Sequence, residues 1–360
     1  MRPHRTRAAD KSTFMWKVLS LTLAVLLLSA VWGGTRTFAS VSKAAPAAAK
    51  LKFVLVTPNP IGADAFLQLG KVGIQKAGKK YKATTQVLEA TDPTSRDEDV
   101  RAAISNGATI VVVMGFEFND IIPKYASTNP KVHFLIIDQC ITNPAKNVRC
   151  ARFKEYEVNY LLGVAAGKLT KTGKIGAIGA LDIPFLHRYT DAFAEGAQHV
   201  NPQVKADTRW VATDPSGFSD PAKAKEEALA MAAGGDDQIL AAASGSNLGV
   251  FQAAQEKNFD AYGVDVNQCP LAPGHIVDNA VKAVDVVMLK SIDGILHNKG
   301  AQDVQYGLAS GGLTLSTLSA KKPSTTKCLL AKHPSILSLI KKVRQQIISG
   351  KIKIKDPMGG

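Results

Sequence analysis

The stretch that decides the fold is residues 51–57, LKFVLVT, an apolar run closed by Pro58 and Pro60. A run of this kind is typical of a strand buried on both faces of a parallel sheet. A helical pattern follows over residues 64–79, and the strand–helix unit then recurs along the chain. Alternating strands and helices predict right-handed crossovers and parallel sheets, and so an α/β fold.

The same alternation continues in two series, separated by a crossover that looks irregular at 140–156. In the first series the pattern predicts strands at 84–88, 109–114 and 132–138, with helices at 97–106 and from Asn119. The second opens with a helix at 157–169 and continues with strands at 174–178, 204–210, 238–242 and 261–264, and helices at 191–200, 221–233 and 248–257. The body is too long for one compact set of layers, so two lobes of similar size are expected.

Each lobe is predicted to be a parallel sheet flanked by helices. We expect residues 51–153 and 276–300 in lobe I, residues 154–275 in lobe II, and residues 301–360 as a C-terminal segment that packs across both lobes and ends in a basic tail. Parallel sheets bind ligands at the carboxyl ends of their strands. Two such edges that face each other form a cleft, and this cleft can close around a solute by a hinge motion.

The N-terminal residues 1–39 have the three zones of an export signal. Arginines and lysines from Arg2 to Lys17 come first, an apolar run follows at 18–31, and Thr37-Phe38-Ala39 offers small residues for cleavage. The apolar run is shorter than the ~20 residues of a membrane-spanning helix. We therefore expect a cleaved signal peptide, a flexible spacer at 40–50 and a periplasmic or extracellular protein; a leader that stays uncut would tether it to the membrane.

The charge is uneven along the chain. The chain has 44 basic and 30 acidic residues. Residues 1–40 hold six basic residues and one acidic residue, and residues 321–360 hold ten basic residues and one acidic residue, so 28 of each remain in the body. A neutral body argues against nucleic-acid binding, which needs a basic stripe on the folded domain. The lysines of the tail could touch anionic lipid or a partner, with an ordinary solvated surface as the alternative.

Four cysteines lie in a chain that we expect to be exported, where disulfides persist. Cys140 and Cys150 bracket the turn-rich segment TNPAKN, which suits a local disulfide and leaves Cys269 to pair with Cys328. Reduced core cysteines are the alternative. Zinc binding would need closer ligand spacing with nearby histidines, so no metal site is predicted.

Short motifs along the chain occur in an order that resembles the BMP ("basic membrane protein") family, the substrate-binding proteins of ABC importers. These are VT at 56–57, GADAF at 62–66, GF at 115–116, ID at 137–138, EVNYLLGVAA at 157–166, DIP at 182–184 with Arg188, GFSD at 217–220, GVF at 249–251, GVD at 263–265 and ISGKI at 348–352. The resemblance implies a type I periplasmic binding protein with a hinge and a ligand cleft between its lobes. It implies an ABC permease in the membrane as partner, and a monomer without a cofactor. The best understood members bind purine nucleosides, with the base between two phenylalanines and acidic side chains on the ribose and base edges.

Carried over position by position, the resemblance implies a ligand site of aromatic, acidic and amide side chains and one lysine. These candidates are Asp64, Phe66, Phe116, Asp138, Phe218, Asn247, Asp265 and Lys282. Each has a structural alternative: a phenylalanine can fill a helix core, an aspartate can cap a helix, and a helical lysine is ordinarily solvated. Phe218 lies in the loop SGFS, where a large apolar residue has no helix face to fill. Asp220 precedes Pro221 and a helical run, so it is assigned as an N-cap.

The first loop departs from the family pattern. It reads PNPIGADAFL over residues 58–67, with one acid where the family usually has adjacent acids, and with Leu67 where asparagine is common. The polar contacts for a purine edge are therefore missing from this loop. A purine nucleoside is favoured as ligand, and another aromatic or sugar-like solute stays open.

Catalytic motifs are absent from the sequence. Gly173, Gly176 and Gly179 are spaced by threes without a G-x-G-x-x-G fingerprint, and residues 245–249 lack the G-x-S-x-G elbow. The histidines show no metal-ligand spacing. The sequence therefore favours a binding protein over an enzyme, with a ligand sensor for a membrane receptor as an alternative to an importer subunit.

Overall fold

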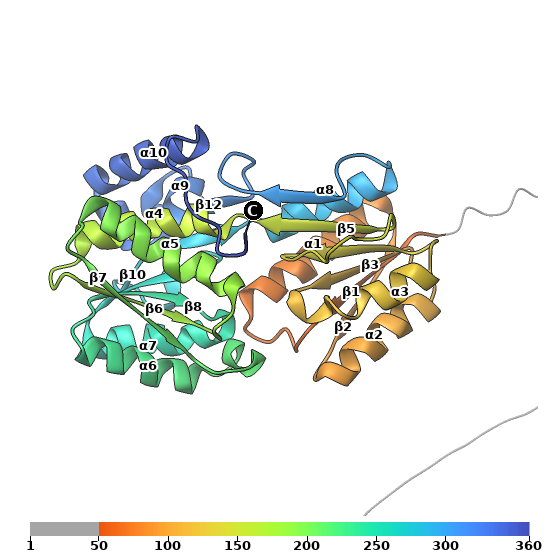
Figure 1. Cartoon of the computed structure of the whole chain (residues 1–360), viewed down its shortest axis with the longest axis horizontal. Helices are drawn as coiled ribbons and strands as arrows, with labels where there is room; N and C mark the ends of the chain where they lie inside the picture. Colours follow the sequence, from red (N-terminus) through yellow and green to blue (C-terminus); the bar gives the residue numbers. More distant parts are fainter. Residues whose placement is uncertain (1–49, 360) are drawn as a thin grey trace, which may run out of the picture. The chain divides into compact units, whose positions relative to one another are not determined.

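The computed structural model describes residues 50–359, so the predicted signal peptide and nearly all of the spacer lie outside the described residues. Within the described residues, no helix is both long and apolar enough to cross a membrane. The described chain folds around two six-stranded sheets, each covered by helices on both faces (Figure 1).

The first sheet has the strand order β11-β5-β4-β3-β1-β2, and all its neighbours are parallel. Its strands are β1 (Lys52–Thr57), β2 (Thr84–Glu89), β3 (Ile110–Met114), β4 (His133–Ile137), β5 (Val148–Phe153) and β11 (Asp303–Tyr306). Side chains alternate between its two faces. Phe53 and Leu55 pack in the core under α1 (Ala65–Tyr81) and α8 (Val284–Leu296), whereas Val54 and Val56 pack with α2 (Pro93–Ser105) and α3 (Ile122–Thr128). Burial on both faces explains why the central strands β1, β3 and β4 are almost continuous apolar runs.

The second sheet repeats this order as β12-β10-β9-β8-β6-β7. Its strands are β6 (Lys174–Gly179), β7 (Lys205–Trp210), β8 (Gln238–Ala242), β9 (Asp260–Asp265), β10 (Ile276–Lys282) and β12 (Leu313–Leu315), of which β12 alone runs antiparallel to its neighbour. Helices α4 (Glu155–Leu169) and α5 (Pro184–Val200) cover one face, and α6 (Pro221–Ala233) and α7 (Asn247–Lys257) the other (Figure 1). α4 and α5 approach closely because Gly163 and Gly196 lack a side chain: a Cβ at either would lie 2.0 Å from a carbonyl oxygen of the facing helix.

Short elements complete the described chain. They are the 3-10 turns η1 (Phe116–Phe118), η2 (Pro215–Phe218), η3 (Ser244–Ser246), η4 (Cys269–Leu271), η5 (Pro323–Thr326) and η6 (Leu329–Lys332), the short helix α9 (Ser316–Ser319) and the last helix α10 (Pro334–Ile348). α10 packs against α4 on the second lobe.

The predicted two-lobed α/β architecture is confirmed, and the chain passes between the lobes three times. It passes from β5 to α4, from β10 to α8, and from β11 to β12. The assignment of residues 276–282 to lobe I is wrong, because β10 hydrogen-bonds along β9 in the second sheet. The chain returns to the first lobe only with α8, which packs on α1.

Several element bounds match the prediction and some differ. α6 and β8 have the predicted bounds, but β5 lies inside the segment expected to be irregular. Its sequence VRCARF carries two arginines and lacks the apolar run that marks β1, β3 and β4. α5 begins at Pro184 rather than Asp191, since proline fits the first turn of a helix.

Both predicted cysteine pairs form disulfides in the structure. The sulfur atoms of Cys140 and Cys150 lie 2.08 Å apart, and those of Cys269 and Cys328 lie 1.99 Å apart. The first pair ties the loop after β4 to β5, and the second ties η4 to the residue that precedes η6. Each disulfide thus fixes a loop within one lobe.

Candidate ligand-binding site

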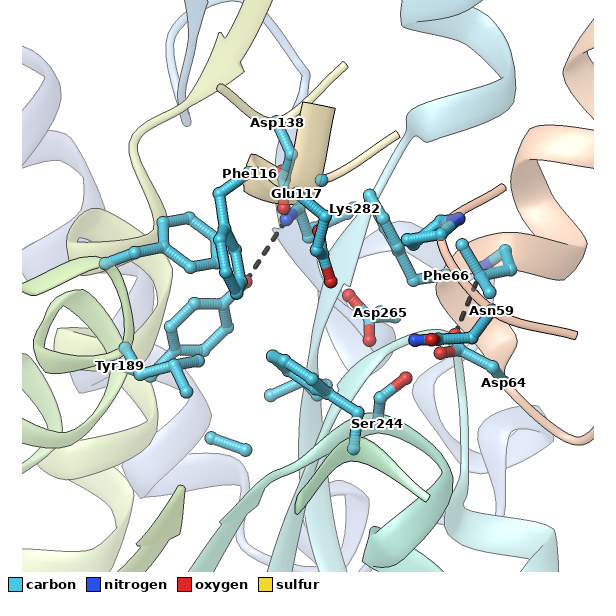
Figure 2. A pocket seen from close by; sticks show the side chains of 18 residues that line it. Asn59, Asp64, Phe66, Phe116, Glu117, Asp138, Tyr189, Ser244, Asp265 and Lys282 are labelled. Carbon is cyan, nitrogen blue, oxygen red and sulfur yellow. Dashed lines mark hydrogen bonds and ion pairs between the residues drawn. The ribbon is translucent and has the colours of Figure 1, made fainter. Parts of the chain in front are cut away.

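A pocket lies where the carboxyl ends of both sheets meet (Figure 2). The space between its lining residues amounts to about 590 Å³, which includes open solvent at its mouth. In the first lobe, the lining residues come from the loop after β1, the start of α1 and the ends of β3 and β4. In the second lobe, they come from α5, η2 and the ends of β8, β9 and β10. This is the edge at which parallel sheets bind ligands.

Seven of the eight candidate residues line this pocket. They are Asp64, Phe66, Phe116, Asp138, Phe218, Asp265 and Lys282. Asn247 does not, and its prediction as a ligand residue is wrong: its side-chain oxygen accepts from the Ala243 amide at 2.8 Å, and its amide lies 3.4 Å from Gln268. It is fully buried and holds the backbone behind the pocket. Asp220 caps α6 by accepting from the Lys223 amide, as predicted.

The backbone turns sharply where four central strands end at the pocket. Gly115, Asp138, Ser244 and Asp265 have φ of 94°, 82°, 50° and 70°. L-residues rarely adopt this left-handed region, although aspartate enters it more readily than most, and such strain gathers at functional sites. The turns direct the side chains at the strand ends into the pocket instead of along the sheet.

Aromatic rings form much of the pocket wall. Phe66 lies in the first turn of α1, Phe116 begins η1 and Phe218 ends η2. α5 adds Phe185 and Tyr189, whose ring centres lie 5.8 Å apart in an edge-to-face arrangement. Sequence reasoning missed this last pair, because aromatic residues four positions apart in a helix look the same as a core-facing stripe.

Lys282 is the central cation of the pocket. Its buried ammonium lies 2.5 Å from Asp138 Oδ1 and 3.1 Å from the Tyr189 hydroxyl. It also lies 5.0 Å from the centre of the Phe66 ring, within cation–π range. Burial opposes the charge, but the Asp138 carboxylate, Tyr189 and Glu155 outweigh it, so the pKa of Lys282 is raised well above its ordinary value. Lys282 is therefore a fixed positive charge, not the solvated helical lysine that the sequence left open.

Two carboxyl groups face the middle of the pocket without a partner. Glu117 and Asp265 make no hydrogen bond or ion pair with another residue in the described part of the chain, and both point inward in Figure 2. Burial raises the pKa of Glu117 to about 7 and that of Asp265 to about 7. Glu117 was not among the sequence candidates, although its place beside Phe116 at the end of β3 could have marked it.

Acidic groups outnumber cations in the pocket wall. Asp64, Glu117, Asp138 and Asp265 line it, and Lys282 is the only basic residue among the lining residues. Asp64 also caps α1 by accepting from the Leu67 amide, and burial raises its pKa. No group of three or more His, Cys, Asp or Glu side chains in residues 50–359 is placed to hold a metal ion. The wall therefore suits a solute rich in hydroxyl or N–H donors.

Comparison with known proteins identifies the family. Residues 50–356 match the family model described as "ABC transporter substrate-binding protein PnrA-like". The chain is 28% identical to the ABC transporter nucleoside-binding protein BmpA of Lactococcus lactis, over 94% of this chain and 98% of that protein. It is 31% identical to basic membrane protein D of Borreliella burgdorferi, over 78% of this chain and 81% of that protein.

Solved structures show the same fold. A solute-binding protein of an ABC transporter system from Aeropyrum pernix superposes with a TM-score of 0.74 at 22% identity, over 85% of this chain and 94% of that one. A solute-binding protein of an ABC transporter system from Conexibacter woesei superposes with a TM-score of 0.64 at 18% identity, over 85% of this chain and 99% of that one. With a family model that spans nearly all described residues, the chain belongs to the BMP family of ABC transporter substrate-binding proteins.

Proposed function

We propose that the protein binds a nucleoside, with a purine nucleoside favoured, and delivers it to an ABC permease in the membrane. The observation that carries this proposal is the combination of Phe66 and Phe218 with four carboxyl groups in one pocket between two lobes. An aromatic ring can stack on any base, because every base has a π-face. Carboxylates and a lysine provide the acceptors and the donor that a ribose needs.

The two ends of such a ligand need different walls. The base lies between Phe66 of the first lobe and Phe218 of the second. The ribose hydroxyls donate to Asp265 and Asp138, and Lys282 donates to a ribose oxygen. The relative from Lactococcus lactis, whose name describes it as nucleoside-binding, supports this choice of ligand.

Glu117 compensates for the short first loop. That loop carries Asp64 as its one acid, and Asp64 is already engaged as the cap of α1. Glu117, at the end of the neighbouring β3, brings a free carboxyl group to the same side of the pocket. It thus supplies an acceptor for the N–H groups of a purine edge.

Ligand capture involves both lobes. Phe66, Glu117 and Asp138 belong to the first lobe, and Phe218 and Asp265 to the second. A solute that touches both sets stabilises the closed arrangement, since it has no comparable contacts when the lobes are apart. The permease then reads the closed form. The protein acts outside the cytoplasm as a monomer, with its leader cleaved after export, and it binds its solute without chemical conversion.

Calorimetry against a nucleoside panel tests the proposal. Adenosine, guanosine and inosine should bind with one site per chain, and mass spectrometry of the purified protein should find a co-purifying nucleoside. The pyrimidine nucleosides uridine and cytidine serve as the comparison for base size. No heat and no thermal shift with any nucleoside would refute the proposed ligand while leaving the family assignment intact.

A sugar-like or polyol solute is the second candidate, because four carboxyl groups offer more acceptors than a ribose uses. Including myo-inositol, ribose and galactose in the same panel distinguishes the two. Binding of a polyol without binding of any nucleoside would select this second candidate.

A further inference from the structure

A buried chain of alternating charges connects the ligand pocket to the C-terminal tail. It runs through Asp138, Lys282, Glu155, Arg188 and Asp356. Lys282 Nζ lies 2.5 Å from Asp138 and 3.2 Å from Glu155 Oε1. Arg188 Nη1 lies 3.3 Å from Glu155 Oε2, and the guanidinium donates two hydrogen bonds of 2.7 and 2.6 Å to Asp356. None of the five side chains is more than 10% exposed.

Two members of this chain of charges lie at passages between the lobes. Glu155 is the first residue of α4, directly after the chain leaves β5, and Lys282 is the last residue of β10, directly before α8. Asp138 belongs to the first lobe and Arg188, on α5, to the second. Asp356 is the only acidic residue among residues 321–360, and it lies in the tail that follows α10. Asp138 and Lys282 line the pocket, whereas Glu155, Arg188 and Asp356 do not.

The geometry around Arg188 shows what Asp356 does. Arg188 Nε and Nη2 form the forked contact with Asp356. The third nitrogen, Nη1, donates to Glu155 and, at 3.2 Å, to the Phe153 carbonyl. A guanidinium without Asp356 would be free to take both oxygens of the remaining carboxylate, because its donors match that group in pairs. Glu155 Oε1 would be easily drawn away, since it has no hydrogen bond in the described structure, only the ion contact to Lys282.

We propose that Asp356 is a positioning residue for the ligand pocket: it occupies Arg188, so that Glu155 stays beside Lys282 and Lys282 stays against Asp138. The C-terminal tail thereby shapes the site without touching the solute. Its effect on solute affinity rests on the proposed function, whereas its effect on Lys282 does not need a ligand.

The ligand-free test follows the titration of Lys282 by NMR in protein carrying 13C-labelled lysine, with its signal assigned by its loss in Lys282→Arg. The titratable groups whose charges act on Lys282 are Asp138, Tyr189, Glu155, Asp265 and Asp64. Wild type should keep Lys282 protonated up to high pH. Asp356→Asn should lower the titration midpoint, and Asp356→Glu should restore it.

A control separates this effect from the loss of any forked arginine–carboxylate pair. Arg152 forms a forked contact of the same kind with Asp303, at 2.9 and 2.5 Å, but this pair is more exposed and makes no hydrogen bond or ion pair with Lys282, Glu155 or Arg188. Asp303→Asn should therefore leave the Lys282 signal unchanged. Adding Arg188→Gln to Asp356→Asn removes the competing guanidinium and should return Lys282 toward wild-type behaviour. If Asp356→Asn does not fold, Asp356→Ser takes its place in the test, because the serine hydroxyl still offers Arg188 one acceptor.

Affinity provides the second readout. For a nucleoside that binds wild type, Asp356→Asn should weaken binding about tenfold, the size expected for coupling within one charge network. An unchanged Lys282 titration in Asp356→Asn would overturn the inference, whether or not a nucleoside binds. A shifted titration in a protein that binds no nucleoside would support it and refute the proposed ligand instead.

Discussion

Asp138 and Asp265 occupy equivalent positions in the two sheets. One directly follows β4 and the other ends β9, the strands in the same place of the shared strand order, and both have positive φ, of 82° and 70°. Their environments differ: Asp138 is paired with Lys282, whereas Asp265 has no partner in the described structure. The same turn therefore presents one neutralised and one free carboxyl group to the pocket, and this difference can be measured.

Replacing Asp265 should stabilise the ligand-free protein at high pH. Burial raises its pKa from 3.8 to about 7, so the folded state binds the proton more tightly than the unfolded state. The contribution of the protonated carboxyl group to the free energy of unfolding is complete below pH 3.8, and it is lost as the pH rises through about 7. Asp265→Asn should thus raise the free energy of unfolding at pH 8 by about 4 kcal/mol at most, and by little at pH 4.

The matched variant Asp138→Asn should act in the opposite direction. It leaves the buried Lys282 without its closest partner, and breaking a buried pair costs about 3–5 kcal/mol. Urea unfolding at pH 4 and pH 8 measures both variants. Equal stability of Asp265→Asn and wild type at pH 8 would contradict a buried, partnerless carboxylate.

The affinity for a nucleoside should fall as the pH drops below about 7. In the proposed complex, hydroxyl and N–H groups of the solute donate to the ionised forms of Glu117 and Asp265, whose pKa values are raised to about 7. Each group that must be ionised contributes up to about a tenfold loss per pH unit. Calorimetry from pH 5 to pH 8 should show this loss, with a shallower slope in Glu117→Gln. Identical slopes for both proteins would exclude Glu117 from the contact.

Phe218→Ala should weaken nucleoside binding far more than Asp220→Ala. Base stacking on an aromatic side chain is worth about 1–3 kcal/mol, or about one to two decades in affinity. Asp220 instead caps α6, so its loss should lower folding stability by about 1 kcal/mol and leave affinity nearly unchanged. Titration and melting curves of both variants decide it. A Phe218→Ala protein with wild-type affinity and a lower melting temperature would make Phe218 a core residue.

The two disulfides should stabilise the protein unequally. Cys140 and Cys150 are 10 residues apart, and Cys269 and Cys328 are 59 apart. On loop-closure entropy the shorter loop is worth about 3 kcal/mol and the longer about 4. Paired serine variants, compared by urea unfolding, should rank in that order. Peptide mapping without reduction should find both links; four free thiols in the exported protein would refute them.

The sequence identified the pocket well wherever an apolar strand ends in a distinctive residue. Asp138 and Asp265 follow such strands, so the rule for parallel sheets predicted that they lie at one edge. Phe66 and Phe218 were added by the resemblance to the BMP family. Asn247 was misassigned because a polar residue at a helix N-terminus serves backbone and ligand equally well. Phe185 and Tyr189 were missed because the spacing of a helix face does not tell whether it meets a core or a cavity.

The sequence by itself determined the alternation of strands and helices, the two lobes, the family and the sheet edge at which the pocket lies, since all of these follow from local periodicity and the order of motifs. Only the tertiary structure decided which charges are paired. Lys282 meets Asp138 across 144 residues of chain, and Arg188 meets Asp356 across 168. Such contacts depend on how two sheets and a C-terminal tail pack. Burial removes the water that would otherwise screen these charges, and it is packing, not spacing along the chain, that makes Lys282 a fixed part of the site.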